Sequence, residues 1–194
     1  MTRYTLIIMA KAPMMGRAKT RLAADIGVVH ANRLYKMMMT RVIRNTADPR
    51  WDTVLAVTPR SKIGHVPQWQ GQTQIAQTSG SLTPRLQAVF ARKGPVVVIG
   101  TDCPDVLAID IADAFAAMGR SNAVLGPADD GGFWLIGLNG PARLDLFDTV
   151  RWSHHETLAD MTARFTCPVT RLRTLVDVDD KLALDLWRGR HKGL

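Results

Sequence analysis

The sequence of 194 residues has little of what builds disulfide frameworks, zinc sites or membrane spans. Its two cysteines, Cys103 and Cys167, lie far apart without the spacing of a metal motif, so we expect free thiols in a cytoplasmic protein. No apolar run reaches the roughly 18 residues of a membrane span. The apolar stretch 4–10 is too short for a signal peptide, and Lys11 follows it at once.

Aromatic residues are also scarce, at 6% of the chain, and they do not alternate with basic residues. The sequence therefore lacks the patterns of nucleic-acid-binding proteins. A formal net charge of +8 still favours anionic partners. We predict a basic pocket for nucleotide phosphates, and charge scattered over a solvated surface is the open alternative. With 46% apolar residues, the chain suits one α/β domain over residues 1–194.

A Walker A sequence and the three-glycine dinucleotide fingerprint are both absent, yet a phosphate-type loop follows the first predicted strand, residues 3–10. Gly16 lies in this loop together with four cations, Lys11, Arg17, Lys19 and Arg21. A strand, a basic loop with a glycine and a helix commonly hold phosphate, because amides and cations face the anion. The alternative is a solvated basic helix start, which the helix macrodipole disfavours.

An acidic turn follows the central strand. The β-branched run 96–99 is typical of a strand buried on both faces, as in a parallel sheet. Asp102 and Asp105 come directly after it, where open α/β sheets bind ligands. These acids are candidates for holding a divalent cation on a phosphate. In the alternative interpretation, Asp105 caps the next helix and Asp102 accepts from turn amides.

A second acidic turn contains Asp129, Asp130, Gly131 and Gly132. Locally, a plain hairpin turn is the stronger interpretation. The functional hypothesis is that the glycines let the backbone approach a ligand while Asp129 or Asp130 accepts from its hydroxyls.

Two further segments have alternative explanations. Ser153 and Glu156 form the pattern of a capping box before a helix that reaches Phe165, which leaves His154 and His155 unexplained. The last predicted strand, 169–176, ends in Asp177, Asp179 and Asp180. Asp179 or Asp180 is a candidate cap for the following helix. Equally, this acid cluster meets the first one across the sheet crevice.

Strand and helix patterns alternate along the chain and predict a three-layer α/β/α domain, with a Rossmann-like, mostly parallel but mixed sheet. The further predicted strands are 51–57, 73–77, 122–125 and 133–138, and the helices include 28–46, 82–90, 109–118 and a C-terminal helix around residues 182–187.

Together, these segments resemble the nucleotide-diphospho-sugar transferase superfamily, which has the glycosyltransferase-A fold. The resemblance is strongest to a bacterial glycosyltransferase group, some of whose members are linked to arsenosugar biosynthesis, and that group is similar to 2-phospho-lactate guanylyltransferases. The matching motifs run from residue 6 to about residue 187. They are Lys-Ala-Pro…Gly-Arg-Ala-Lys-Thr-Arg-Leu, Gln77…Gly80…Arg85-Leu86, Gly-Thr-Asp-Cys-Pro-Asp, Gly-Pro-Ala-Asp-Asp-Gly-Gly-Phe, Trp152-Ser153 and Asp-Val-Asp.

The resemblance implies roles for individual residues. A divalent metal, Mg²⁺ or Mn²⁺, is expected at Asp102, Asp177 and Asp179, although Asp180 and Lys181 replace the family's Thr-Pro. The acceptor side is expected at Gly131, Gly132, Ser153 and His154. The nucleotide-binding positions are Ala10, Lys11, Gly16, Arg17, Lys19, Arg21, Gly80 and Arg85.

The expected activity is metal-dependent glycosyl transfer from a nucleotide-sugar donor to a small-molecule acceptor. Asp102, Asp129 and Asp130 are the candidate catalytic residues, with His154 as a further candidate base. A guanylyltransferase-like nucleotidyl transfer to a small phosphorylated acceptor is the first alternative. A non-catalytic module that binds nucleotide is the second.

Overall fold

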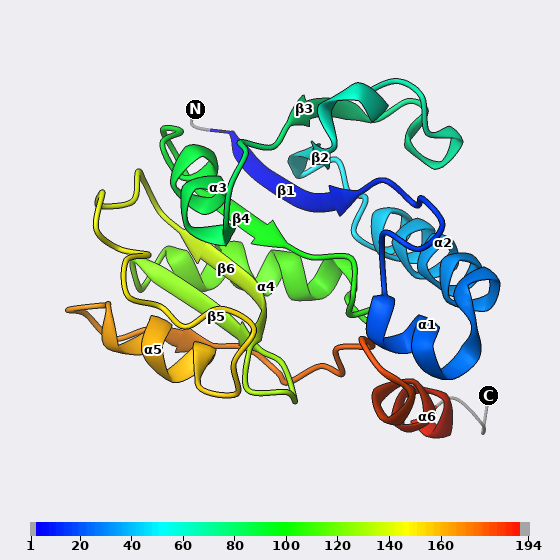
Figure 1. The fold of residues 1–194 in the computed structure, drawn as a ribbon. Coiled ribbons are helices and arrows are strands. Elements are labelled where there is room, and N and C mark those ends of the chain that lie inside the picture. Colours follow the sequence, from blue (N-terminus) through cyan, green and yellow to red (C-terminus); the bar gives the residue numbers. More distant parts are fainter. Residues whose placement is uncertain (1–2, 191–194) are drawn as a thin grey trace.

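Seven strands form one mixed sheet in the order β3-β2-β1-β4-β6-β5-β7 (Figure 1). The computed structural model describes residues 3–190. Strands β1 to β4 are parallel to one another, and β6 runs antiparallel to both β4 and β5, which confirms the predicted mixed sheet. The strands are β1 Tyr4–Lys11, β2 Trp51–Thr58, β3 Thr73–Ala76, β4 Val96–Ile99, β5 Ala123–Pro127, β6 Phe133–Leu138 and β7 Thr170–Arg171.

Helices cover both faces of the sheet, as the sequence predicts. Helices α2 and α4 lie behind it in Figure 1, while α3 and α5 lie in front. None of the helices between residues 3 and 190 has both the length and the apolar character that a bilayer crossing requires. The helices are α1 Thr20–Ile26, α2 Val28–Asn45, α3 Leu82–Val89, α4 Ala108–Met118, α5 Thr157–Ala163 and α6 Lys181–Arg190, with short 3₁₀ turns at Arg60–Lys62 and Pro67–Trp69.

Strand β4 contributes to the core on both sides of the sheet. All four of its residues are buried. Val97 and Ile99 pack with the side chains under α2 and α4, while Val96 and Val98 pack with those under α3 and α5, because successive side chains of a strand point to opposite faces. The β4 residues therefore fix the position of the turn that carries Asp102.

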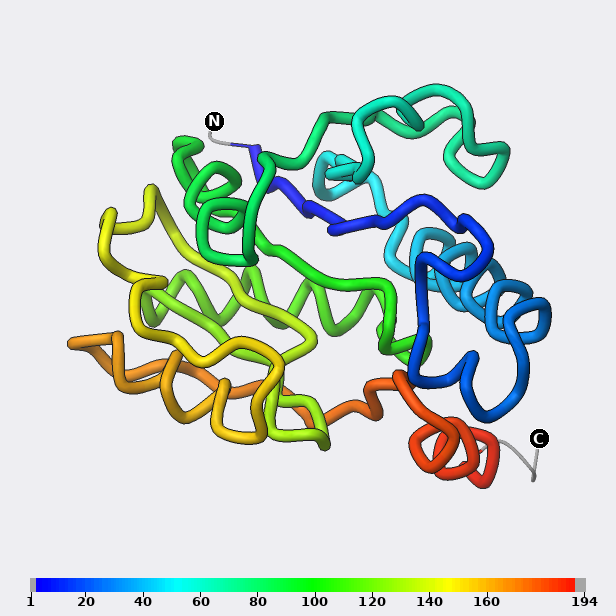
Figure 2. The backbone as a smooth tube through the Cα atoms, in the orientation of Figure 1, coloured from blue at the N-terminus to red at the C-terminus, as the bar shows by residue number. Residues whose placement is uncertain are grey.

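The last predicted strand is much shorter than expected. Only Thr170 and Arg171 pair with β5, and a single further bridge joins Leu175 to Ala128. Between them, the chain is held by other bonds: the indole of Trp134 donates to the carbonyl of Arg173 at 3.0 Å. The segment 172–180 therefore leaves the sheet edge and runs as an extended chain toward α1, as the orange part of the tube shows in Figure 2.

The predicted capping box at Ser153 and Glu156 is wrong. Ser153 has a φ of 55°, and α5 begins only at Thr157, without a side-chain cap. The hydroxyl of Thr157 lies 2.6 Å from the carbonyl oxygens of both Arg151 and His154. These two contacts of Thr157 shape the turn before the helix. The sequence pattern assigned that role to Ser153.

Gly137 in β6 tests how tightly the core under α4 is packed. A Cβ added there would lie 2.6 Å from Val124 Cγ1 and 3.0 Å from Met118 Sδ. We expect Gly137→Ala to lower the free energy of unfolding by about 1–3 kcal/mol, because overpacked cores must shift. Urea denaturation measures this loss.

The matched control is Gly189→Ala in α6, where nothing lies within 4 Å of the added Cβ. It should leave stability unchanged or raise it by up to about 1 kcal/mol, since glycine disfavours a helix. Equal losses in both variants would contradict the packing argument.

Candidate active site

The ammonium of Lys19 lies among three carboxylates at the carboxyl edge of the sheet. Its Nζ is 2.7 Å from Asp102 Oδ1, 3.3 Å from Asp179 Oδ1 and 4.0 Å from Asp177 Oδ1. Only 3% of the Lys19 side chain is exposed. The predicted basic loop and both predicted acid clusters therefore meet at one point, where the blue and orange parts of the chain come together in Figure 2.

Backbone contacts hold these groups in place. The amide of Val178 donates to the carbonyl of Asp102 at 2.9 Å, which ties segment 172–180 to the turn after β4. The amide of Asp177 donates to Asp129 Oδ1 at 3.0 Å. Lys19 itself has a φ of 53° and a ψ of 48° just before α1. This left-handed conformation costs a non-glycine residue about 1–3 kcal/mol and persists only where its surroundings enforce it.

The cluster carries more negative charge than one lysine balances. Burial alone would lower the pKa of Lys19, but the carboxylates of Asp102 and Asp177 outweigh it and hold that pKa above its usual value. Burial and the neighbouring Asp102 charge raise the pKa of Asp177 to about 7, against the opposing effect of Lys19. The carboxylates of Asp102, Asp177 and Asp179 thus outnumber the one ammonium that lies among them.

Tyr35 connects the end of β1 to the turn after β4. Its hydroxyl donates to the carbonyl of Lys11 at 2.8 Å and accepts from the amide of Lys11 at 3.2 Å. The Thr101 hydroxyl lies 3.4 Å away. Burial raises the pKa of Tyr35 to about 12, so this hydroxyl stays protonated and able to donate.

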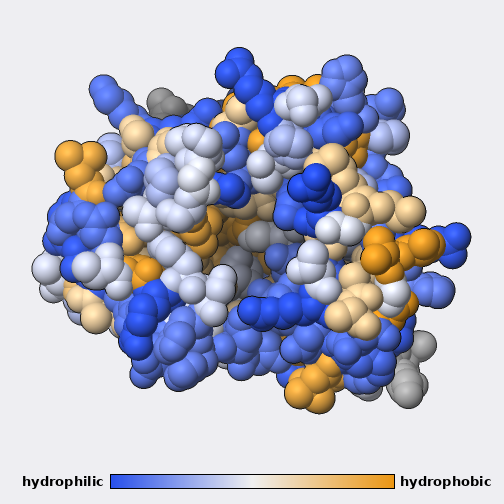
Figure 3. All heavy atoms as spheres, viewed as in Figure 1, coloured by the Kyte–Doolittle hydropathy of each residue, from blue (hydrophilic) through white to orange (hydrophobic). Residues whose placement is uncertain are grey.

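A cavity of about 150 Å³ opens between β1 and the turn after β4. Both cations and carboxylates are among the groups that line this cavity. Figure 3 shows the surface hollowed over the central strands on the side seen in Figure 1. The cavity is lined by Met9, Lys11, Ala18, Lys19, Tyr35, Thr101, Asp102 and Asp179.

A second cavity, of about 120 Å³, lies on the other side of the acids, between Asp102, Asp177, Phe133 and Trp134. Cys103 also lines it. Burial and the charge of Asp177 raise the pKa of this thiol well above its usual value. Because the thiolate is the reactive form of cysteine, Cys103 is not suited to act as a nucleophile.

Two of the predicted nucleotide-binding residues, Gly80 and Arg85, form one corner with Gln77 beside Ala10. The side-chain amide of Gln77 donates to the carbonyls of Ala56, at 2.7 Å, and Ala10, at 3.4 Å. Arg85 donates in turn to Gln77 Oε1 at 3.1 Å and to the carbonyl of Gly80 at 3.0 Å. Gly80 has a φ of 98°, which glycine alone adopts readily.

The remaining loop residues are more exposed. Gly16 and Arg17 lie on the surface, and the amide of Arg17 donates to the carbonyl of Met14 at 3.1 Å. Arg21 is 3.4 Å from Asp179 Oδ2 with a 70% exposed side chain. Both cations therefore face solvent, and Arg21 does so beside the acid cluster.

The turn at 129–132 is the hairpin that local sequence favours. Its ends join β5 to β6, and Asp130 Oδ1 accepts from the amide of Gly132 at 2.8 Å. Gly131 has a φ of 86°, and a Cβ there would lie 1.9 Å from the carbonyl oxygen of His155. The backbone that approaches Gly131 is thus the chain's own.

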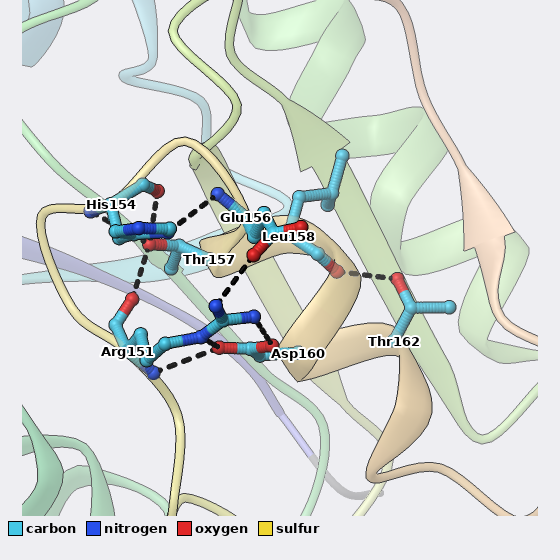
Figure 4. Close-up of polar contacts among 7 residues, drawn as sticks. All are labelled: Arg151, His154, Glu156, Thr157, Leu158, Asp160 and Thr162. Atoms are coloured by element: carbon cyan, nitrogen blue, oxygen red, sulfur yellow. Dashed lines mark hydrogen bonds and ion pairs between the residues drawn. The ribbon is translucent and has the colours of Figure 1, made fainter.

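The segment before α5 is held by Arg151, which lies between Glu156 and Asp160 (Figure 4). The Nδ1 atom of His154 accepts from the amide of Glu156 at 3.1 Å, so the neutral ring carries its proton on Nε2. Ligand atoms of His154, His155 and Glu156 lie within 4.8 Å of one another. A metal there would have to displace Arg151 from Glu156.

Asp105 is not the cap of α4, which is Leu107. Its carboxylate accepts from the indole of Trp187 at 2.9 Å and lies 3.5 Å from Arg41 Nη2. Asp110 takes the helix position instead, because its carboxylate accepts from the amide of Leu107 at 2.8 Å.

Sequence reasoning missed the pair of Arg173 with Asp110. The guanidinium contacts both carboxylate oxygens, at 2.6 and 2.7 Å, and also donates to the carbonyl of Asp105. This pair anchors the start of the segment that carries Asp177. An arginine and an aspartate that are 63 positions apart give no local sequence signal of their pairing. The contact of Tyr35 with Lys11 gives no such signal either, because Tyr35 lies within a helix.

A family model described as "Uncharacterized protein conserved in bacteria (DUF2064)" matches residues 42–154. None of the curated proteins matches the sequence. A solved structure described as a candidate nucleotide-diphospho-sugar transferase, from Desulfovibrio desulfuricans G20, is 25% identical with a TM-score of 0.86, and the match covers 100% of this chain and 89% of that one. This neighbour confirms the predicted superfamily.

More distant structures share the fold. Rv0371c from Mycobacterium tuberculosis H37Rv, solved in complex with manganese, is 15% identical with a TM-score of 0.55, and the match covers 100% of both chains. A CMP:2-keto-3-deoxy-manno-octonic acid synthetase complexed with CTP is 12% identical with a TM-score of 0.60, and the match covers 98% of both chains.

The anchoring role of Arg173 is testable. Asp110 is 5% exposed, so Arg173→Met leaves its carboxylate buried with the Leu107 amide. We expect a loss of about 1–3 kcal/mol in the free energy of unfolding, measured in urea. The control is Arg143→Met, whose exposed pair with Asp145 at 3.2 Å should contribute less than about 1 kcal/mol. A loss no larger than in the control would argue against the anchor.

Proposed function

The chain belongs to the DUF2064 family of bacterial proteins, and we propose that it is a transferase that uses a nucleotide-activated donor at the carboxyl edge of β1 and β4. The observation that carries this proposal is the position of Lys19, 2.7 Å from Asp102 and beside a cavity that Lys11 also lines. A phosphate chain with its metal ion matches this mixture of cations and carboxylates, because phosphate binds to lysine and metal binds to acids.

The acid cluster fits a divalent metal. All its donor atoms are carboxylate oxygens, which suit the hard ions Mg²⁺ and Mn²⁺, and three carboxylates surround a single ammonium. Asp102, Asp177 and Asp179 would hold the ion. When bound, it neutralises the phosphates of the donor. The manganese in the structure of Rv0371c supports this choice of ion.

The other side of the cavity suits the nucleoside and its phosphates. Ala10, Gly80 and Arg85 form a corner at the end of β1 in which backbone groups lie near one another. We assign this corner to the base. Lys11 and Lys19, with Gly16, Arg17 and Arg21 in the exposed loop, are assigned to the phosphates, whose charge they neutralise.

The acceptor is assigned to the side of the 129–132 hairpin, with Gly131, Gly132, Ser153 and His154. Asp129 is engaged with the amide of Asp177, so its role is positional. The Nδ1 atom of His154 accepts from the amide of Glu156, so the neutral ring carries its proton on Nε2. This Nε2–H group suits His154 to donate a hydrogen bond to the acceptor. Asp130 uses only Oδ1 on Gly132, which makes Asp130 the best candidate for the general base.

Glycosyl transfer is the reaction we favour, in keeping with the description of the neighbour from Desulfovibrio desulfuricans. In that reaction, the acceptor oxygen loses its proton to the base and attacks the sugar carbon, and the nucleoside diphosphate leaves with the bonding electrons. The second candidate is nucleotidyl transfer, favoured by the fold shared with a CTP-bound synthetase. There, the acceptor attacks the α-phosphorus and pyrophosphate leaves.

Metal removal tests the binding site. We expect at least one nucleotide or nucleotide-sugar, with Mn²⁺, to raise the thermal midpoint by about 5–10 °C at 100 times its dissociation constant, because such binding adds about 2.7 kcal/mol. Chelation with EDTA and the variant Asp102→Asn should each remove most of this shift. Asp113→Asn, an exposed aspartate in α4, is the control. A shift that survives EDTA would instead favour the non-catalytic module.

The leaving group tests the reaction. Incubation with nucleotide-sugars and candidate acceptors, followed by ³¹P NMR, should show release of nucleoside diphosphate. Asp130→Asn should slow that release by about 10²-fold or more, as expected for loss of a general base, without removing the thermal shift. Release of pyrophosphate from a nucleoside triphosphate, with no diphosphate from any nucleotide-sugar, would establish the second candidate and overturn the first.

A further inference from the structure

Lys19 occupies the position that a metal ion would need. Its ammonium makes a 2.7 Å contact with Asp102 and a 3.3 Å contact with Asp179, with Asp177 at 4.0 Å. The side chain is 3% exposed, so it fills the space between the acids. Exposed lysines sample many positions in solvent, whereas this one is fixed by three negative charges and by the backbone before α1.

We propose that Lys19 is a built-in counter-ion that competes with the divalent cation for Asp102, Asp177 and Asp179, so that the nucleotide-free protein excludes the metal. This inference rests on the proposed function for the class of metal, but it concerns the chain without nucleotide. The ammonium must leave the carboxylates before the ion can bind to them.

Electrostatics makes the two cations mutually exclusive. A divalent ion and an ammonium at the same carboxylates would repel each other about twice as strongly as two unit charges at the same separation. When all three carboxylates are ionised, they and the ammonium sum to two negative charges, and Arg21 contacts Asp179 through Oδ2. Replacing the ammonium with a divalent ion leaves the cluster more nearly neutral.

The neighbouring cavity gives the displaced ammonium a place to go. Lysine is a compact charge on a flexible four-carbon stem, so its ammonium can move while the Lys19 backbone and α1 stay in place. The cavity of about 150 Å³ lies directly beside it, with Lys11, Tyr35 and Thr101 on its walls. A phosphate bound there would accept hydrogen bonds from the displaced ammonium, and its other oxygens would be ligands for the metal. Metal and phosphate would then assist each other's binding.

Titration with Mn²⁺ alone tests the competition. Isothermal titration calorimetry of the full chain should show weak binding to the wild type and binding at least about tenfold tighter to Lys19→Met, because the acids lose their resident cation. Lys93→Met removes the same charge at an exposed site before β4, at the opposite edge of the sheet, and should stay within about twofold of the wild type. Equal affinities in the wild type and Lys19→Met would overturn the proposal.

A second measurement uses only the wild type, in case Lys19→Met does not fold. The Lys19 ammonium, buried in an ion pair, should give a distinct ¹⁵N side-chain resonance, which Mg²⁺ alone should shift or abolish at concentrations that saturate the acids. A Lys19 resonance unchanged by bound Mg²⁺ would show that lysine and metal coexist, and would overturn the competition. Failure of all nucleotides to bind would count against the proposed function, whereas these metal titrations would still decide the role of Lys19.

Discussion

The contact between the Lys19 ammonium and the carboxylates of Asp102, Asp177 and Asp179 is the interaction on which the rest of the site depends. It joins two segments about 160 positions apart in the sequence, the loop after β1 and the extended chain before α6. A buried charge is costly unless it is paired, so neither segment can move away alone without leaving a charge unbalanced. The contact of Lys19 with the three carboxylates therefore contributes more to the geometry of the crevice than to the stability of the fold.

Other polar contacts extend this constraint to the surrounding elements. Arg173 fastens the start of the extended segment to Asp110 on α4, and Asp129 accepts from the amide of Asp177 at its far end. Tyr35 on α2 holds the end of β1 near the turn after β4. The contacts of Arg173 and Tyr35 cross from one layer of the fold to another, so the position of the acids depends on the packing of α2, α4 and the central strands together.

Much of this arrangement could be predicted from the sequence, because the pattern of apolar residues and the topology of a parallel sheet determine it. The apolar runs give the strands, and the carboxyl ends of parallel strands share one edge of a sheet, so Asp102 and the 177–179 acids were expected to meet. Their roles in binding remain predictions. The short β7 and the pairing of Asp110 with Arg173 could not be predicted, because contacts between distant residues override the local pattern. The turn at Ser153 was predicted wrongly because the hydroxyl of Thr157, and not that of Ser153, makes the contacts that shape it.

The distribution of charge gives the crevice two different electrostatic characters. The net charge of +8 attracts polyanions from a distance, and Arg17 and Arg21 are exposed cations on either side of the start of α1. Within the crevice, the acids around Lys19 attract cations at short range. A site built to retain a metal permanently would not need a lysine among its ligands, whereas a site that accepts metal only together with phosphate needs a cation that can change partners. A compact, flexible ammonium meets that requirement, while a rigid guanidinium, which bonds carboxylates in pairs, would hold them too firmly.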